Sequence, residues 1–252
     1  MGHWYDKDGN PRHITNGRST TLRDARKHDL VPSVSTVWGD MINKPMLHRW
    51  KENGLMEALY TGGCAECDAK KNGSPDFIRR EKEARGIFGA IQQDTQDRGT
   101  TVHDALEKKF KGEKIPAGFV EIGNNVKEAL DRICGKQTWV PEKTFAHREG
   151  YGGMVDLHSE SFCVDFKTKA LEPDKEVNIK KMIYPDHGVQ LAAYDHGLGN
   201  SGRTLINLFI DVNSSRVYEW EHDNPEYNLE CFLAALKLWK LMKKYDPKWY
   251  IM

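Results

Sequence analysis

The chain has 252 residues, no formal net charge, 38% hydrophobic residues and 29% charged residues. This composition supports a hydrophobic core with a well-solvated surface, and the length fits one large domain, alone or with a helical addition. No apolar run approaches the roughly 20 residues that cross a bilayer, and the polar residues 1–6 lack a secretory signal. We therefore expect a cytoplasmic protein with no membrane partner.

The first half of the chain is predicted to be mainly helical. Residues 3–14 indicate a hairpin around the turn residues Asp8-Gly9-Asn10-Pro11, and helices are expected at 44–60, 76–111 and 119–134. Gly86 or Gly99 is expected to interrupt the second of these helices, and residues 61–75 are expected to form a loop. The basic cluster at residues 12–28 either binds phosphate or forms a solvated face.

The pattern changes near residue 138 to short β-rich stretches. Strands are predicted at 138–148, 151–159, 161–168, 204–212 and 215–221, and helices at 186–198 and 226–245. The fold class is therefore α/β (α+β), with a mixed sheet flanked by helices. We divide the chain into an N-terminal hairpin and helical region, 1–135, and a β-rich core, 136–252.

The five cysteines are irregularly spaced, so a disulfide framework is not expected. Cys64-x-x-Cys67 is either half of a zinc site or a pair of reduced thiols.

The chemically informative residues lie on two neighbouring predicted strands. Asp165 and Lys167 are two positions apart and share one face, whereas Phe166 points the other way. A tight hairpin near residue 160 would bring Asp156 close to Asp165. Carboxylates in this arrangement suit Mg²⁺ or Mn²⁺, with the Phe166 backbone carbonyl as a further ligand, and Lys167 would stabilise charge on a phosphate. The alternative is an exposed strand face that carries a salt-bridged Asp–Lys pair.

Two further residues follow on the next predicted helix. Gln190 and Tyr194 are four positions apart and so lie on one helix face. Gln190 would bond a phosphate or the attacking water and Tyr194 would support it, unless Tyr194 simply packs the helix.

Together these features resemble the RecB-like branch of the PD-(D/E)XK nucleases. Gly99-x-x-x-His103 on a helix, Gly152-Gly153-x-x-Asp156, Asp165-x-Lys167-Thr168 and Gln190-Leu191-x-x-Tyr194 occur in the order of that branch, over residues 98–195. Residues 32–37 and Leu47-x-x-Trp50 are similar to the N-terminal part of phage exonucleases and the mitochondrial genome maintenance exonuclease. A phage origin, with the host cytoplasm as location, is the corresponding expectation.

The resemblance implies a PD-(D/E)XK, restriction-endonuclease-like core, with residues 1–135 covering the active site. It implies His103, Asp156 and Asp165 as metal ligands, Lys167 as catalytic lysine and Glu142 as an additional acid. No iron–sulfur cluster is expected, because Cys231 is the one cysteine in the C-terminal portion. The candidate contacts to nucleic acid are Arg23, Arg26, Ser33, Ser35, Thr36, Trp50 and Arg98.

The expected activity is a metal-dependent DNA exonuclease that acts on single-stranded ends in replication, recombination or repair, with proteins of those processes as possible partners. Two alternatives stay open: a structure-specific endonuclease of the same fold, and a non-catalytic DNA-binding protein with a nuclease fold.

Overall fold

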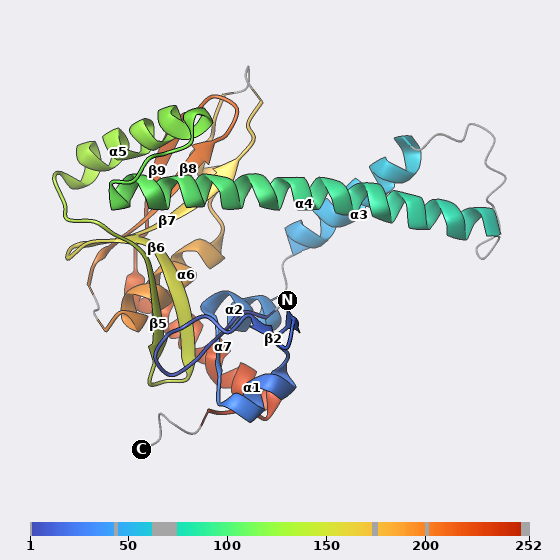
Figure 1. Ribbon diagram of the computed structural model, residues 1–252, viewed down its shortest axis with the longest axis horizontal. Helices are drawn as coiled ribbons and strands as arrows, with labels where there is room; N and C mark the ends of the chain where they lie inside the picture. Colours follow the sequence, from blue (N-terminus) through green and yellow to red (C-terminus); the bar gives the residue numbers. More distant parts are fainter. Residues whose placement is uncertain (1, 43–44, 62–74, 173–175, 200–201, 248–252) are drawn as a thin grey trace. The chain divides into compact units, whose positions relative to one another are not determined.

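The computed structural model describes residues 2–42, 45–61, 75–172, 176–199 and 202–247 (Figure 1). Two compact units are present, one formed by Met1–Ile42 with Val102–Met252 and the other by Asn43–Thr101. Cys64, Cys67 and most of the loop predicted at 61–75 lie outside the described residues.

The first unit is built on a mixed sheet of five strands in the order β5-β6-β7-β8-β9. The strands are Val140–His147 (β5), Tyr151–His158 (β6), Phe162–Lys169 (β7), Thr204–Asp211 (β8) and Val217–Glu221 (β9). β7 and β8 run parallel, and the other neighbours are antiparallel. The mixed α/β class predicted from the sequence is confirmed, and each of the five predicted strands is present.

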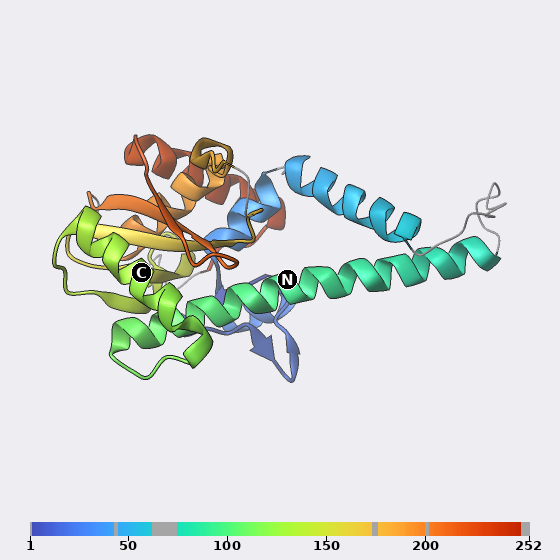
Figure 2. The same ribbon diagram turned by 90° about the horizontal axis from the view of Figure 1, so that it is seen from above.

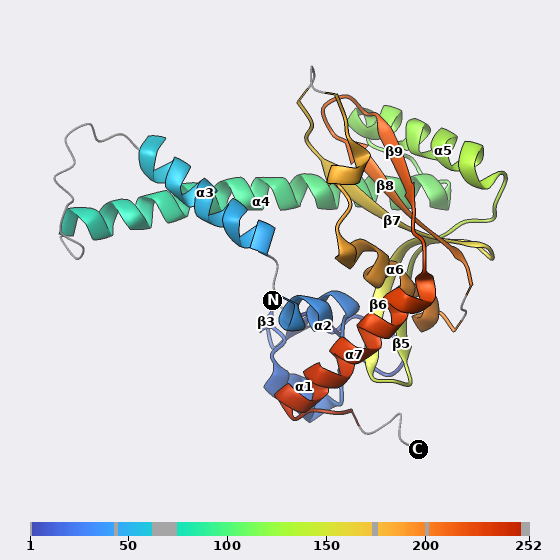
Figure 3. The same cartoon turned by 180° about the vertical axis from the view of Figure 1, so that it is seen from behind.

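Helices cover both faces of this sheet (Figures 2 and 3). One face carries α6 (Pro185–Gly197) and α7 (Pro225–Lys243), and the other carries α5 (Val120–Cys134) with the last turns of α4. Ile122, Val126 and Leu130 recur every four residues, so α5 buries one apolar stripe. Short 3₁₀ turns, Ala117–Phe119 and Ile179–Lys181, precede α5 and α6.

Successive side chains of β7 point to opposite faces of the sheet, so their positions determine which residues face which helices. Cys163 lies in the core beneath α6, whereas Val164 and Phe166 lie in the core beneath α5. By the same period, Asp165 and Lys167 face the α6 side.

The N-terminal segment is more structured than predicted. The turn at residues 6–10 is present, but β1 (Trp4–Tyr5) pairs with β4 (Val31–Pro32), and the compact hairpin is β2 (Ile14–Thr15) with β3 (Arg18–Ser19). The sequence patterns also missed α1 (Leu22–His28) and α2 (Val34–Met41). Both are two turns long, too short for a periodic apolar pattern to be visible.

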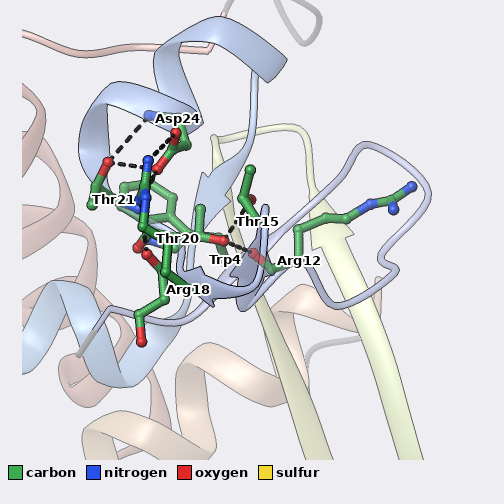
Figure 4. A network of polar contacts seen from close by, with 8 residues as sticks. Trp4, Arg12, Thr15, Arg18, Thr20, Thr21 and Asp24 are labelled. Atoms are coloured by element: carbon green, nitrogen blue, oxygen red, sulfur yellow. Dashed lines mark hydrogen bonds and ion pairs between the residues drawn. The ribbon is translucent and has the colours of Figure 1, made fainter.

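Side-chain caps and ion pairs hold this segment together (Figure 4). Thr21 and Asp24 form a capping box at the start of α1, and Arg18 bonds both oxygens of Asp24, at 2.8 and 3.0 Å. Thr20 Oγ1 donates to the Arg12 carbonyl at 2.5 Å, while the Arg12 side chain points away from the cluster. Part of the predicted basic cluster is therefore occupied by structural contacts.

The second unit consists of α3 (Pro45–Thr61) and the first part of α4 (Pro75–Lys111). The predicted interruption near Gly86 or Gly99 is wrong, because α4 is one continuous helix of 37 residues. A Cβ added to Gly54 of α3 would lie 2.1 Å from the Phe88 ring of α4, so glycine at this position allows the two helices to approach closely. Among the helices that the structure describes, none is both long and apolar enough to cross a membrane.

Candidate active site

The site begins where β6 and β7 separate. The two strands pair at Leu157↔Val164 and His158↔Cys163, and the same register would place Asp156 opposite Asp165. The ladder is not continued there: Asp156 Oδ2 accepts the amide hydrogen of Phe166 at 2.8 Å instead. A side chain therefore replaces a backbone carbonyl as acceptor, and both carboxyl groups lie at the fork between the strands.

Three side chains that could hold a metal ion meet on one side of this fork. Ligand atoms of His103, Glu142 and Asp156 all lie within 4.8 Å of one another. His103 is in the last part of α4, within the first unit, and its Nδ1 lies 3.5 Å from Asp156 Oδ1. Two carboxylates and an imidazole form a donor set suited to a divalent cation.

Glu142 is held in this cluster by an unusual backbone. Its φ is 51°, in the left-handed region, within strand β5. Pro141↔Leu157 and Lys143↔Val155 pair on either side of it, so Glu142 stands opposite Asp156 in register. Non-glycine residues seldom adopt this conformation, and such outliers concentrate at functional sites.

A second set of contacts runs from β7 to α6. Lys167 Nζ lies 2.7 Å from Asp165 Oδ2 and donates to Gln190 Oε1 at 3.1 Å. Gln190 Nε2 in turn donates to the Tyr194 hydroxyl at 2.8 Å. The sequence-predicted pair Gln190 and Tyr194 therefore braces Lys167. Gly153 leaves room for the Tyr194 ring, because a Cβ at this position would lie 2.9 Å from both Phe145 and Tyr194.

The charges of the site are mutually perturbed. Burial, together with Asp156 and Glu107, raises the pKa of Glu142 to about 7. Burial also raises the pKa of Asp165, against the attraction of Lys167. Burial alone would lower the pKa of His103, but the negative charges of Asp156 and Asp165 outweigh burial, so the pKa of His103 is raised. Repulsion from neighbouring carboxyl groups adds to the shifts of Glu142 and Asp165, and a bound cation would relieve that repulsion.

Sequence reasoning missed two residues that hold Asp165. Asn207, fully buried on β8, donates from Nδ2 to Asp165 Oδ2 at 2.6 Å and to the Asp165 carbonyl at 3.1 Å. His222 Nε2 lies 2.7 Å from Asn207 Oδ1. Asn207 Oδ1 can only accept, so His222 Nε2 donates this bond. Burial lowers the pKa of His222 to about 4. The one available signal was a polar side chain inside the apolar run 204–210.

The Phe166 side chain lies in the core and not at the fork. Its ring packs 6.0 Å from His103 and 6.4 Å from Phe110, centroid to centroid. The role of its backbone carbonyl as a metal ligand stays a prediction.

The predicted nucleic-acid contacts are dispersed. Ser33 Oγ caps α2 by accepting the Thr36 amide at 3.0 Å, and it also bonds the Ser35 and Thr36 hydroxyls. Arg26 donates to the Lys243 carbonyl at 2.6 Å, whereas Arg23 is exposed on α1. Apart from Arg23, these residues make contacts within the fold, and the contacts of all of them to nucleic acid stay a prediction.

The other two predicted contacts belong to the second unit. Trp50 is 45% exposed and packs against Phe88, with 5.4 Å between ring centroids. Arg98 pairs with Asp94 at 3.0 Å on the exposed surface of α4. Both side chains are accessible within their own unit.

Comparison with solved structures gives distant similarities. No protein-family model and no curated protein matches the chain. A solved structure described as SSO0001 is 15% identical with a TM-score of 0.36, over 78% of this chain and 87% of its own. An alkaline exonuclease (LHK-Exo) from Laribacter hongkongensis is 15% identical with a TM-score of 0.31, over 52% of this chain and 75% of its own. At these values, function has to be inferred from the site itself.

Proposed function

We propose that this protein is a divalent-metal-dependent deoxyribonuclease of the PD-(D/E)XK type. The observation that carries the proposal is the convergence of His103, Glu142 and Asp156 within 4.8 Å, at the fork where β7 presents Asp165 and Lys167. An exposed Asp–Lys pair, the alternative left open by the sequence, would not require these additional ligands. Nor would it require a buried carboxylate: Asp165 is 3% exposed.

The donor set favours a hard cation. Carboxylate oxygens suit Mg²⁺ and Mn²⁺, and the imidazole of His103 makes Mn²⁺ somewhat more favourable than it would be in an all-oxygen site. His103, Glu142 and Asp156 would hold the ion. Asp165 lies outside this group of three, and its Oδ2 contacts Lys167 and Asn207, so its role as a metal ligand stays a prediction. Bound there, it would polarise a phosphate and lower the pKa of a water molecule.

The chain's own residues complete the chemistry. Asp165 holds Lys167 as an ammonium, because the 2.7 Å contact outweighs burial and raises the pKa of Lys167. That fixed positive charge would stabilise the negative charge that develops on a phosphate during cleavage. Gln190 positions the ammonium, and Tyr194 positions Gln190. The geometry is therefore organised before substrate binds.

DNA with a free single-stranded end is the proposed substrate, and an exonuclease in phage-type replication, recombination or repair is the proposed role. Support comes from the order of the four sequence motifs, which resembles the RecB-like nucleases, and from the accessible Trp50, Arg23 and Arg98. Aromatic and basic side chains of this kind bind single strands by stacking and charge.

The test uses end-labelled DNA, linear and circular, single- and double-stranded, with Mg²⁺, Mn²⁺ or EDTA. We expect linear single strands to be degraded only with metal, and circles to survive. Lys167→Ala should reduce cleavage by about 100-fold or more, as loss of a donor to a developing oxyanion does. Lys127→Ala, which removes an exposed lysine on α5, is the matched control and should cleave normally.

Three results would change the assignment. Rapid nicking of circular DNA would favour an endonuclease of the same fold. DNA binding without any cleavage would favour a non-catalytic binding protein. Normal turnover by both Lys167→Ala and Asp156→Asn would remove the proposed active site altogether.

A further inference from the structure

A second cluster of metal-ligating side chains lies at the opposite end of β6. Ligand atoms of His147, Glu149 and His196 all lie within 4.8 Å of one another. His147 ends β5, Glu149 follows in the turn to β6, and His196 is in the last turn of α6. Asp156 lies five positions along β6 from Tyr151, which is at this end of the strand, a distance of roughly 16 Å. The cluster is therefore distinct from the candidate active site.

We infer that His147, Glu149 and His196 bind a transition-metal cation of the Zn²⁺ class. Two imidazole nitrogens and one carboxylate oxygen are a ligand set that zinc accepts, with a fourth position left to water. Mg²⁺ prefers oxygen ligands, so this cluster differs in metal preference from the one at the fork. Each of the three side chains is partly accessible, so a cation can reach the site from solvent.

The hydrogen bonds of Tyr151 prepare His196 for this role. The Tyr151 hydroxyl donates to the Ala193 carbonyl at 3.2 Å, and its oxygen lies 2.7 Å from His196 Nδ1. In the tautomer that can bind a metal through Nε2, the Tyr151 hydroxyl donates to Ala193 and its oxygen accepts from Nδ1–H of His196. A neutral His196 ring then carries its free lone pair on Nε2, the atom left available to a metal. Metal-bound histidines commonly have such a partner on the other nitrogen.

The remaining contacts fix the turn that bears Glu149. Lys240 Nζ on α7 donates to the Glu149 carbonyl at 2.6 Å and pairs with Asp246 at 2.9 Å, which offsets its charge. The His147 and His196 rings lie 4.5 Å apart, centroid to centroid. The Glu149 amide lies 3.4 Å from His147 Nδ1, at the long limit of a hydrogen bond, so little is lost if this ring turns to bind a cation.

A cation at this position would join the β5–β6 turn to the end of α6. That helix also carries Gln190 and Tyr194, two turns and one turn before its end. We therefore assign the site a structural role, in which zinc binding stabilises the folded state by mass action. At a hundredfold excess of free Zn²⁺ over the dissociation constant, the expected increase in Tm is about 5–10 °C.

The experiment measures Zn²⁺ binding by equilibrium dialysis and Tm by circular dichroism, and it does not depend on nuclease activity. The background is the full chain with His103→Gln and Asp156→Asn, which removes two ligands of the other cluster. We expect this background to bind one zinc ion per chain and to gain Tm. Adding His147→Gln or Glu149→Gln should weaken binding at least tenfold and abolish the gain. His28→Gln, at an exposed histidine on α1, is the matched control and should change neither.

His196 is left unchanged because its Nδ1 also supports Tyr151. If His147→Gln fails to fold, the partly exposed Glu149→Gln variant still decides the question. Zinc binding that persists undiminished in Glu149→Gln and in any folded His147→Gln protein would overturn the inference. So would a background protein that folds and binds no zinc, since the three residues would then be only a hydrogen-bonded cluster.

Discussion

Replacement of Asn207 with aspartate tests whether Asp165 is held in place from the neighbouring strand. Asn207 Nδ2 donates to the carboxylate and the carbonyl of Asp165, and its Oδ1 accepts from His222. Asn207→Asp preserves the shape of the side chain but converts this donor into an acceptor with a negative charge. The new carboxylate would then stand against the buried carboxylate of Asp165, at the position of a 2.6 Å hydrogen bond.

The magnitude follows from the contacts that are lost. The bond to the Asp165 carboxylate is worth about 1.5–3 kcal/mol, and the bond to the carbonyl about 1 kcal/mol. Repulsion between two buried carboxylates adds to this, so we expect the free energy of unfolding to fall by about 3–5 kcal/mol at pH 8. The deficit should shrink as the pH falls, because protonation of either carboxyl removes the repulsion and restores a donor.

The assay is urea unfolding of the variant and the wild type at pH 8 and pH 5, in EDTA, followed by cleavage assays with Mn²⁺. Asn124→Asp is the matched control: Asn124 is exposed on α5, where its Oδ1 accepts from Lys109, and it should change stability by less than about 0.5 kcal/mol. A displaced Asp165 should also reduce cleavage by about 10–100-fold, as loss of a partner to a metal ligand does. A pH-independent loss below about 1 kcal/mol with normal cleavage would refute the positioning role of Asn207.

Three further outcomes are expected. Because the pKa of Glu142 is raised to about 7, its ionisation destabilises the metal-free fold as the pH rises from about 4.5 through 7. In EDTA, the Glu142→Gln variant should therefore unfold at a higher urea concentration than the wild type at pH 8 but not at pH 4. Equal urea midpoints at pH 8 would contradict this. Arg203 Nη1 lies 2.7 Å from Asp195 Oδ1, and both side chains are less than 10% exposed. Arg203→Leu removes this ion pair and should lower the free energy of unfolding by about 3–5 kcal/mol. A loss below about 1 kcal/mol would show that the Asp195 carboxylate does not need Arg203. Trp50→Ala should weaken single-stranded DNA binding by about 1–3 kcal/mol in fluorescence titrations with little change in Tm, and unchanged affinity would place this ring outside the DNA path.

The strands and the main helices were predictable because their signals are local. Alternation placed Asp165 and Lys167 on one face, and the structure joins them by a 2.7 Å ion pair. The four-residue spacing of Gln190 and Tyr194 likewise predicted a shared helix face, and their side chains bond each other. In each case the informative separation is two or four residues, within the period of a single element.

What the sequence concealed depends on contacts between distant parts of the chain. Asn207 is 42 residues from Asp165, and in the sequence it is a polar residue in an apolar strand with no visible role. Its role becomes visible only when β7 and β8 are paired in parallel, because Asn207 then stands beside Asp165. His147 and His196 are far apart in sequence and belong to a strand end and a helix end. Ser33, predicted to contact DNA, uses its hydroxyl to cap an eight-residue helix that local propensity did not reveal. Tertiary packing, not periodicity, sets each of these features.

Glu142 shows why the unpredicted features gather at the fork. A β-rich stretch at 138–148 predicts extended backbone throughout, yet Glu142 adopts a φ of 51°, at a cost of about 1–3 kcal/mol. Burial and the charge of Asp156 add an electrostatic cost, which appears as the raised pKa of Glu142. Attraction by His103 lowers the pKa of Glu142 but does not outweigh burial and the neighbouring acids. A cation shared with His103 and Asp156 would offset both costs, because it needs the carboxylate at this position and neutralises the repulsion between the two acids.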